Sequence, residues 1–386
     1  MWDDLRKDVG TMAGRIVAWR RDLHRHPGIA WQEEWASHYL REHFKKLGLP
    51  VKKMAGTGLR AIVKGRPGGK TVALRTDMDA LPLQEEGDKA YLSLHAGAAH
   101  SCAHDGHMAV LMAAAELLAR RKGAFKGNVV FLCQPAEEHP PGGAKKMIEE
   151  GALEGVDGIF GLHFWQPLPT GTLGIVKGPM MAQSDNIWIT VKGRGGHGAL
   201  PHTTVDPIFV AAQLVVGLQS IVSRNVDPLK PAVLTFGAVH GGTANNIIPA
   251  EVKLSGTVRT LDSGVQALMK KRIREAAEGT CAAFGAAAEI VYEEGYPVLV
   301  NDPASVDLVL SVAERALGEE SLLAIDPLMG GEDFARYLQE IPGAFLFFGA
   351  GDGTKHPHHH PAFDIDEKAL APAAFLMTAL ALDYLK

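Results

Sequence analysis

Apolar residues in the first part of the chain recur with two different periods. Spacings of three to four residues predict helices, which fall at residues 15–24, 33–47, 105–121 and 143–150. Short runs rich in Val, Leu and Ile predict buried strands, at residues 59–64, 71–75, 128–133 and 158–163. Strands that alternate with helices are typical of a mostly parallel sheet with helices on both faces. We therefore predict an α/β architecture for this part.

The middle of the chain has a different order of elements. Its pattern predicts a strand at 186–192, a helix at 207–222, strands at 232–239 and 251–260, a helix at 264–284 and a strand at 287–293. This βαββαβ order is that of the ferredoxin-like unit, which has two helices on one face of a four-stranded antiparallel sheet. The first rhythm then returns, with helices at 304–317, 332–340 and 368–385 and a strand at 344–349. We expect an α/β domain of residues 1–182 and 296–386, interrupted by an inserted α+β domain of residues 183–295.

Composition narrows the class of protein. The 386 residues carry a net charge of -5 and no long basic run, which argues against nucleic acid as a partner. The three cysteines are too few for a disulfide framework. The N-terminal residues MWDDLRKDVG lack the apolar stretch of a signal peptide, and we find no apolar run long enough to span a membrane. We therefore expect a cytoplasmic protein that does not bind membranes.

Candidate metal ligands gather in separate clusters. The stretch HSCAHDGH at residues 100–107 combines a thiol, imidazoles and a carboxylate, the groups that hold divalent transition metals. Further candidates are Glu137-Glu138, His163 and the triple histidine at 358–360. Asp77, Glu137 and His163 follow or close predicted strands, and ligands bind beyond the carboxyl ends of the strands in such sheets. The clusters are therefore expected to form one site.

These clusters offer more ligands than one tetrahedral zinc ion needs. Two divalent ions that share a ligand and a water account for the surplus. The adjacent acids Glu137 and Glu138 supply two carboxylates with separable tasks. One binds metal, and the other takes the proton of the attacking water.

A series of motifs carries a family resemblance. In chain order they are LRTDMDALPLQEE, HSCAHDGHMAVL, QPAEE, GLHFWQ, GRGGHGALPHTTVDP, NNIIPAEVKLSGTVRTLD, GGEDFA and HHPAFDID. Together they resemble the M20 family of metallopeptidases and amidohydrolases, in particular its aminoacylase, hippurate hydrolase and indole-acetyl-amino-acid hydrolase branch. The resemblance extends over nearly the whole chain. It implies a catalytic metal-binding domain with an inserted lid or dimerisation domain.

The resemblance also implies roles for individual residues in the metal-binding domain. The implied metal ligands are Cys102, His104, Glu138, His163 and His359. His359 is chosen from the triple histidine because the family pattern His-x-Pro-x-Phe matches the run that starts there. Glu137 resembles the general base. Asp77 stands where other branches have a metal-binding histidine, so Asp77 and Asp79 are expected to support the ligands rather than to bind metal.

Three residues of the inserted segment complete the implied site. His197 and Asn246 resemble the groups that stabilise the oxyanion of the tetrahedral intermediate. Arg259 resembles the group that binds the carboxylate of the substrate, a task that suits the planar guanidinium. The sequence departs from the usual branch pattern at Gly28, where Glu is common, and at Ala103, where Gly is common.

The expected activity is that of a metal-dependent amidohydrolase. The substrate would be an N-acyl-L-amino acid with an acetyl, benzoyl or similar acyl group, cleaved by a metal-activated water with Glu137 as base. A dipeptidase or carboxypeptidase with the same two-metal chemistry is the alternative, and the intact ligand set argues against an inactive binding protein. Zinc or manganese is expected, with cobalt or nickel also compatible with the ligands. We expect a homodimer or dimer-based tetramer formed through residues 183–295, with His197 acting in the partner's site or after domain closure.

Overall fold

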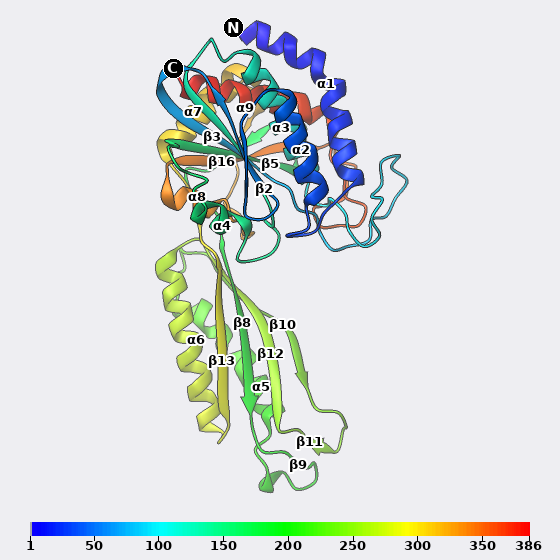
Figure 1. Cartoon of the computed structure of the whole chain (residues 1–386). Coiled ribbons are helices and arrows are strands. Elements are labelled where there is room, and N and C mark those ends of the chain that lie inside the picture. The colour runs from blue at the N-terminus through cyan, green and yellow to red at the C-terminus, as the bar shows by residue number, and fades with distance from the viewer. Residues whose placement is uncertain (1) are drawn as a thin grey trace. The chain divides into compact units, whose positions relative to one another are not determined.

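The computed structural model describes residues 2–386 of the chain (Figure 1), which divide into two compact units. The first unit consists of the segment up to Gly178, Val300–Asp326 and Asp333–Lys386, and the second of Pro179–Leu299 and Pro327–Glu332. The short segment Pro327–Glu332 lies outside the range that the sequence suggested for the inserted domain.

The first unit is built on a mixed sheet. Its strands, in spatial order, are β1 (Val51–Met54), β2 (Gly58–Lys64), β4 (Lys126–Gln134), β3 (Arg66–Asp77), β5 (Gly158–Pro169), β16 (Gly343–Gly351), β6 (Leu173–Gly174) and β15 (Leu322–Leu323). The central strands β4, β3, β5 and β16 run parallel, whereas β2 and β6 pair antiparallel with their neighbours β4 and β16. The carboxyl ends of the four central strands therefore lie along one edge of the sheet.

Helices cover both faces of this sheet (Figure 1). One face packs against α1 (Trp2–Arg25), α2 (Glu34–Lys46), α3 (His104–Arg120), α7 (Pro303–Leu317) and α9 (Leu370–Tyr384). The shorter helices α4 (Gly143–Glu149) and α8 (Ala335–Glu340) contact each other away from that apolar cluster. Helix α1 begins well before the predicted residue 15, because Leu5, Val9 and Met12 continue its buried stripe. Short 3₁₀ turns at Glu319–Ser321 and Glu367–Ala369 complete this unit.

The second unit has the predicted βαββαβ order. Its elements are β8 (Gln183–Lys192), α5 (Pro207–Arg224), β10 (Ala232–Gly241), β12 (Glu251–Thr260), α6 (Ser263–Ala283) and β13 (Ala287–Tyr296). The sheet order β10-β12-β8-β13 is antiparallel throughout, and α5 and α6 bury one face of it. The predicted fold class, a mostly parallel sheet between helices with an inserted ferredoxin-like unit, is confirmed.

Smaller strands lie outside these two sheets. Near one end of the second sheet, β9 (Gly196–His197) pairs with β11 (Ile247–Ile248), and a 3₁₀ turn follows at Pro201–Thr203. Strands β7 (Gly178–Met181) and β14 (Leu299–Asn301) form another two-stranded ladder where the chain passes between the units. The hydrophobic pattern did not predict these short strands, since so few residues carry no clear period.

Helix α5 is the described element that bears on the prediction that no apolar run is long enough to span a membrane. Its 18 residues are long and apolar enough to cross a membrane by length and composition alone. Its inner face, including Val210, Leu214 and Leu218, packs into the core of the second unit. A core helix of this kind meets the same compositional test as a membrane span.

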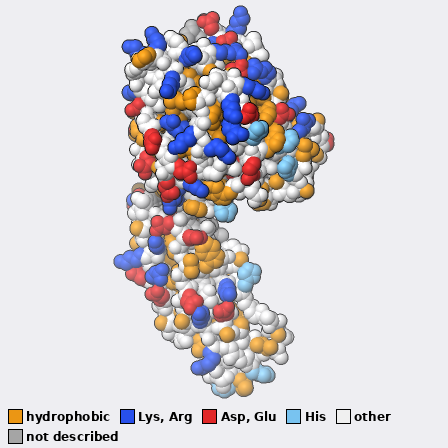
Figure 2. All heavy atoms as spheres, in the orientation of Figure 1, with side chains coloured by type: hydrophobic (Ala, Val, Ile, Leu, Met, Phe, Trp, Pro, Cys, Tyr) orange, Lys and Arg blue, Asp and Glu red, His pale blue; other side chains and the backbone are white. Residues whose placement is uncertain are grey.

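On the visible face of the first unit, basic and acidic side chains are interspersed (Figure 2).

Candidate functional site

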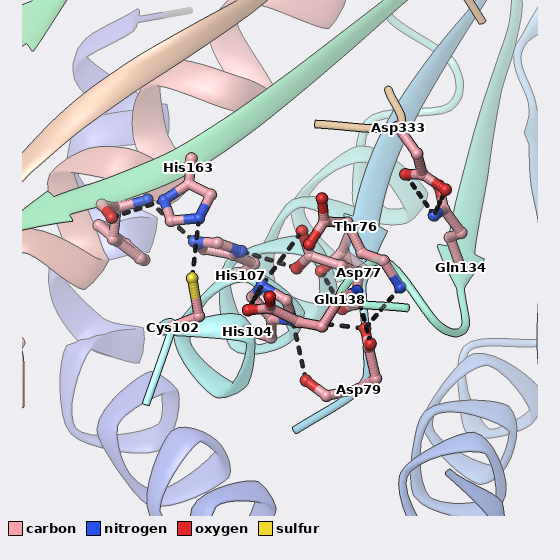
Figure 3. Close-up of polar contacts among 12 residues, drawn as sticks. Thr76, Asp77, Asp79, Cys102, His104, His107, Gln134, Glu138, His163 and Asp333 are labelled. Carbon is pink, nitrogen blue, oxygen red and sulfur yellow. Dashed lines mark hydrogen bonds and ion pairs between the residues drawn. The ribbon is translucent and has the colours of Figure 1, made fainter. Parts of the chain in front are cut away.

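The parallel strands of the first unit bring the candidate ligands to one edge of the sheet (Figure 3). Asp77 is the last residue of β3, and Glu137 and Glu138 follow the end of β4. His163 lies within β5, and His359 lies in the segment after β16. The predicted ligands therefore come from neighbouring strand ends, together with the loop that leads into α3.

Cys102, His104 and His163 form the first group of ligand atoms, which all lie within 4.8 Å of one another. The Cys102 Sγ is 3.4 Å from the His163 Nε2, while the His163 Nδ1 is 2.7 Å from the carbonyl oxygen of Phe164. The His104 Nδ1 lies 2.8 Å from the carbonyl oxygen of Asp79. Because a carbonyl only accepts, both Nδ1 atoms carry a hydrogen, which leaves each Nε2 as the nitrogen available to a metal ion.

Glu138 and His359 form a second group with the same cysteine. The candidate atoms of Cys102, Glu138 and His359 also lie within 4.8 Å of one another. The His359 Nε2 is 3.3 Å from the Glu138 Oε1. Cys102 is thus common to both groups, as a ligand shared between two metal sites would be.

The two histidines beside His359 have other contacts. His358 directs its Nε2 to the carbonyl oxygen of Phe164, at 3.0 Å. His360 stacks on His356, with ring centroids 4.2 Å apart. Of the triple histidine, His359 is the one whose ring reaches Glu138.

His107 lies among the ligands, but its ring nitrogens are already occupied. Its Nδ1 is 2.7 Å from the Asp77 Oδ1, and its Nε2 accepts a hydrogen bond of 2.9 Å from the backbone N–H of Phe164. Burial lowers the pKa of His107, which favours the neutral ring that this pairing requires. His107 therefore supports the ligands, and Asp77 fixes its tautomer.

The backbone of the acidic pair Glu137-Glu138 is held by hydrogen bonds to other carboxylates. Asp79 accepts hydrogen bonds of 2.9 Å from the N–H groups of both Glu137 and Glu138, one on each carboxylate oxygen. The residue before the pair, Ala136, donates its N–H to the buried carboxylate of Glu33 at 2.9 Å. The positions of both glutamates are therefore set by carboxylates that approach from other loops.

Left-handed backbone marks three positions at the site. Ala103, Ala136 and His359 have φ values of 66°, 53° and 65°. Non-glycine residues rarely adopt this conformation, and strain of this kind concentrates at functional sites. Ala103, which stands where Gly is common in the resembling branch, therefore retains the backbone conformation that Gly adopts most easily.

The other departure, Gly28, has a steric reason. A Cβ atom at this position would lie 2.2 Å from the carbonyl oxygen of Gln32 and 2.7 Å from the Cα of Glu33. The loop that carries Glu33 is folded back too tightly for any side chain at position 28. Gly28 therefore allows the compact conformation of this loop, which a Glu side chain at the same position would prevent.

The electrostatics of the cluster fit a divalent ion. Burial and the carboxylates of Glu138 and Glu137 raise the pKa of the Cys102 thiol well above its usual value, so this sulfur needs a cation to become a thiolate near neutral pH. Burial favours a higher pKa for Glu138, but His359 and His104 outweigh it and lower the pKa. The His104 Nε2 is buried and makes no hydrogen bond within residues 2–386. The buried Glu138 Oε1 also makes none, although it has ion-pair contacts with His359 and His104 at 3.3 and 3.9 Å. These residues therefore suit a resident metal.

The second unit carries the other predicted residues at opposite ends. His197 and Asn246 lie together, because β9 pairs with β11 and the Gly198 N–H donates to the Asn246 carbonyl oxygen at 2.8 Å. Asn246 precedes the start of β12 at Glu251, whereas Arg259 is near the end of that strand. Eight strand residues at ~3.3 Å each separate the two ends by roughly 26 Å. One small substrate cannot touch both ends of the same unit.

A match to a protein-family model shows which family the chain belongs to. The model described as Peptidase family M20/M25/M40 matches residues 73–383. The chain belongs to this family. The resemblance drawn from the sequence motifs is thereby confirmed, and this M20 chain is a metal-binding hydrolase.

Individual relatives of the M20 chain cover nearly all of it. It is 42% identical to the N-acetyl-L-cysteine deacetylase of Bacillus subtilis (strain 168), over 96% of this chain and 88% of that protein. It is 37% identical to the thermostable carboxypeptidase 2 of Saccharolobus solfataricus, over 99% of this chain and 98% of that protein. A solved structure of the Bacillus subtilis YXEP protein, a dinuclear metal binding peptidase of the M20 family, has a TM-score of 0.86 and 36% identity, covering 97% and 99% of the two chains.

Sequence reasoning missed a buried polar cluster behind the M20 ligands. Arg75, Gln134 and Asp333 are each at most 3% exposed and hydrogen-bond to one another. Figure 3 shows the contact between Gln134 and Asp333. A signal was present, since each lies inside a quoted motif and two of them interrupt or close apolar strands. Burial without a partner would be costly for such groups, so a shared cluster could have been inferred.

Proposed function

We propose that this M20 chain is a metal-dependent amidohydrolase that cleaves the amide bond of N-acyl-L-amino acids to a carboxylic acid and a free amino acid. The observation that carries the proposal is the arrangement of Cys102 between two ligand groups, with Glu137 fixed beside the ligand Glu138. One relative, at 42% identity, is a deacetylase of N-acetyl-L-cysteine.

Five residues would hold two divalent ions, zinc or manganese: Cys102, His104, Glu138, His163 and His359. Bound ions would polarise the amide carbonyl and lower the pKa of a water molecule. Cobalt and nickel are compatible with the same mixture of thiolate, imidazole and carboxylate. Because a thiolate favours softer ions, we place zinc first among these metals.

Glu137 would act as general base. It is buried, and its backbone N–H is held by the Asp79 carboxylate 2.9 Å away, so its position relative to Glu138 is fixed. The glutamate takes a proton from the attacking water and returns it to the nitrogen of the leaving amine. His197 and Asn246 would donate hydrogen bonds to the oxyanion of the tetrahedral intermediate, because both are exposed and adjacent.

Arg259 would bind the α-carboxylate of the substrate. Its Nε donates to the Thr257 hydroxyl at 3.1 Å, and that hydroxyl donates to the carbonyl oxygen of Asp185 at 2.9 Å. This pairing orients the guanidinium and leaves its outer edge for a carboxylate. A free carboxylate on the substrate is common to N-acyl-amino acids and to carboxypeptidase substrates.

The separation of Arg259 from the pair His197 and Asn246 supports a homodimer, or a tetramer made of such dimers. If all three residues contact one substrate, the two ends of β12 must come from different subunits. We therefore propose that the second unit completes the site of a partner. We further propose a cytoplasmic location, where reduced thiols such as those of the three free cysteines persist.

A substrate panel tests the activity. Zinc-loaded and manganese-loaded protein is assayed on N-acetyl and N-benzoyl amino acids, with dipeptides and longer peptides in parallel. Hydrolysis of N-acyl-amino acids with kcat/KM at least tenfold above peptides is expected. Faster peptide hydrolysis would instead support the carboxypeptidase or dipeptidase alternative, which the relative from Saccharolobus solfataricus favours. Turnover of neither class would contradict an amidohydrolase.

A second arm tests the Arg259 clamp. Amidating the α-carboxylate of the preferred substrate should lower kcat/KM by about two to three orders of magnitude, the scale of a lost charged hydrogen-bond pair. Arg259→Met should show the same low activity on both substrates. Equal turnover of the acid and the amide by the wild-type enzyme would remove Arg259 from the proposed site.

A further inference from the structure

A network of buried side chains extends from the proposed metal ligands to Asp333, where the chain returns to the first unit. Asp333 is the first residue of the segment Asp333–Lys386, directly after the Pro327–Glu332 segment of the second unit. Its side chain is fully buried. It accepts hydrogen bonds from the Gln134 Nε2 at 2.7 and 2.8 Å, from the Ala144 N–H at 3.0 Å and from the Arg75 Nη2 at 3.0 Å.

Arg75 joins Asp333 to the support of the ligands. Its Nε donates to the Gln134 Oε1 at 2.9 Å, and its Nη1 donates to the Asp77 Oδ2 at 2.8 Å. The guanidinium therefore lies between two buried carboxylates, Asp77 and Asp333, and both are oriented by its planar fork.

Asp77 passes this orientation on to a metal ligand. Its other oxygen, Oδ1, fixes the tautomer of His107, whose Nε2 accepts from the Phe164 N–H. The carbonyl oxygen of the same Phe164 holds the Nδ1 of the ligand His163 at 2.7 Å. The Asp77 Oδ2 also lies 3.8 Å from the Nε2 of the ligand His104.

We propose that Asp333 is a positioning residue of the metal site, which acts through Arg75 and Asp77 to orient the ligands. Asp333 and Asp77 both accept from the same guanidinium, so the orientation of one depends on the other. Without the Asp333 carboxylate, the Arg75 fork loses one of the side chains that hold it, Asp77 is less well oriented, and the site would hold a divalent cation less tightly. Residues that orient metal ligands commonly change affinity by about 10- to 100-fold when they are altered.

The surroundings of Asp333 are built for a carboxylate of this length. A Cβ atom on Gly142 would lie 2.2 Å from the Asp333 Oδ2, so the backbone passes directly over the side chain. Three donor groups make four hydrogen bonds to its two oxygens. An amide at position 333 would turn one of its own N–H groups toward these donors and leave the cluster mispaired.

The test compares Asp333→Asn with the double variant Asp333→Asn plus Gln134→Glu. The double change moves the carboxylate to position 134, where it can accept from Arg75 and from the new amide while the net charge is retained. Zn²⁺ affinity is measured by competition with a chelator at pH 8, because burial raises the pKa of Asp333 to about 6 and the carboxylate must be ionised. We expect about 10- to 100-fold weaker binding in the single variant and recovery to within about threefold in the double variant.

Asp185→Asn is the matched control. Asp185 is a fully buried carboxylate of the second unit that accepts from the Gln183 Nε2, the Gln266 Nε2 and the Tyr292 hydroxyl. This variant should lower the urea midpoint of the metal-free protein without changing zinc affinity. If Asp333→Asn behaves as this control does, Asp333 has a purely structural role and the proposal is overturned. The same holds if the double variant folds but binds zinc as weakly as the single variant.

A second single variant covers the case in which Asp333→Asn does not fold. Arg75→Lys keeps the charge but cannot join Asp77 and Asp333 through a planar fork. It should also bind Zn²⁺ about tenfold more weakly, and unchanged affinity would overturn the proposal. The inference rests on the metal site of the proposed function. Zinc binding by the wild-type chain distinguishes failure of this inference from failure of the proposed function. If the wild-type chain does not bind zinc, both are overturned. If the wild type and all variants bind zinc tightly, only this inference is overturned.

Discussion

At the scale of single residues, chemically similar side chains are separated by their hydrogen bonds. His107 and His163 are both buried among the ligands, yet only His163 has an Nε2 that faces a thiol rather than an N–H donor. Glu137 and Glu138 are adjacent, and a carboxylate oxygen of Glu138 lies 3.3 Å from the His359 Nε2. The hydrogen-bond partners of each side chain, rather than its residue type, therefore separate the proposed ligands from the residues proposed to support them.

The two adjacent glutamates should respond differently to removal of their charge. Glu137→Gln should fold and retain metal but lose about 10²- to 10⁴-fold in kcat, because the proton acceptor is gone. Glu138→Gln should weaken metal binding, since it removes the charge of a ligand. Elemental analysis and steady-state kinetics on both variants measure the two effects. Loss of metal from the first variant and not from the second would reverse the assigned roles.

Glu33 should make stability depend on pH. Its carboxylate is fully buried and accepts from Trp31, Ala136 and Thr57. Burial raises its pKa to about 7, with Asp79 adding to the effect. Because the pKa in the folded protein lies above the ordinary 4.5, the contribution to stability is present below pH ~4.5 and is lost as pH rises through ~7.

Glu33→Gln should remove this loss. The amide oxygen can accept from Trp31 and Ala136, and the amide nitrogen can donate to the Thr57 hydroxyl, so every hydrogen bond has a counterpart. The variant should gain up to about 3 kcal/mol relative to wild type between pH 5 and pH 8. Urea unfolding of metal-free protein at both pH values measures the gain, and the exposed neighbour Glu34→Gln is the control. An equal pH dependence in the wild-type protein and the Glu33→Gln variant would contradict the buried charge.

At the scale of elements, strand ends and helix starts position the site. Strands β3, β4 and β5 run parallel, so their carboxyl ends deliver Asp77, the acidic pair and His163 to one edge. Helix α3 begins at His104, directly after the left-handed Ala103. Helix α4 begins after Gly142, under which the Asp333 carboxylate lies. The turns between elements are thus as constrained as the elements themselves.

Two glycines near α4 should respond differently to an added methyl group. Gly142 and Gly155 have φ values of 80° and 68°. A Cβ on Gly142 would meet Asp333 at 2.2 Å, whereas a Cβ on Gly155 meets nothing within 4 Å. Gly155→Ala should cost about 1 kcal/mol through its left-handed backbone alone. Gly142→Ala should cost about 2–4 kcal/mol, because the Gly142 backbone (φ 80°, ψ 158°) lies in a region almost restricted to glycine and the added methyl group also overpacks against Asp333. The urea midpoints of the metal-free variants decide, and equal losses would mean that the Asp333 cluster yields to the methyl group.

At the scale of the whole molecule, the functional residues are divided between two units. The proposed ligands and Glu137 belong to the first unit, whereas His197, Asn246 and Arg259 belong to the second. Within the second unit, the ladder of β8 and β12 fixes Arg259 opposite Ser184 and Glu251 opposite Lys192. This register keeps Arg259 apart from His197 for as long as the sheet is folded.

Complementation between inactive subunits tests action in the partner's site. His197→Ala and Glu137→Gln proteins, each inactive alone, are mixed under conditions of subunit exchange. If His197 serves the partner, half of the dimers are mixed and each mixed dimer has one intact site of two, so activity should recover to about a quarter of wild type. The control is a mixture in which both subunits carry the same substitution, because such dimers contain no intact site. No recovery despite proven exchange would mean that His197 serves its own subunit.

The sequence by itself determined the local features of this protein. Helical and strand periods predicted the main elements, because periodicity reports which side of an element is buried. The order of the motifs identified the M20 family, and the ligand types indicated divalent metals. The missed parts were the early start of α1, the short strands and the segment Pro327–Glu332, where the pattern is weak or the chain crosses between units.

The tertiary structure decided what depends on contacts between distant segments. Arg75 meets Asp333 across 258 positions of sequence, and no local pattern reports such a contact. The ring nitrogen of His104 and of His163 that remains available to metal is set by the carbonyl oxygen beside each Nδ1, because that carbonyl fixes a hydrogen on Nδ1. The distance between Arg259 and Asn246 depends on the strand that separates them. Residue types along the chain therefore specify the available chemistry, whereas pairing in space specifies which atoms are left to perform it.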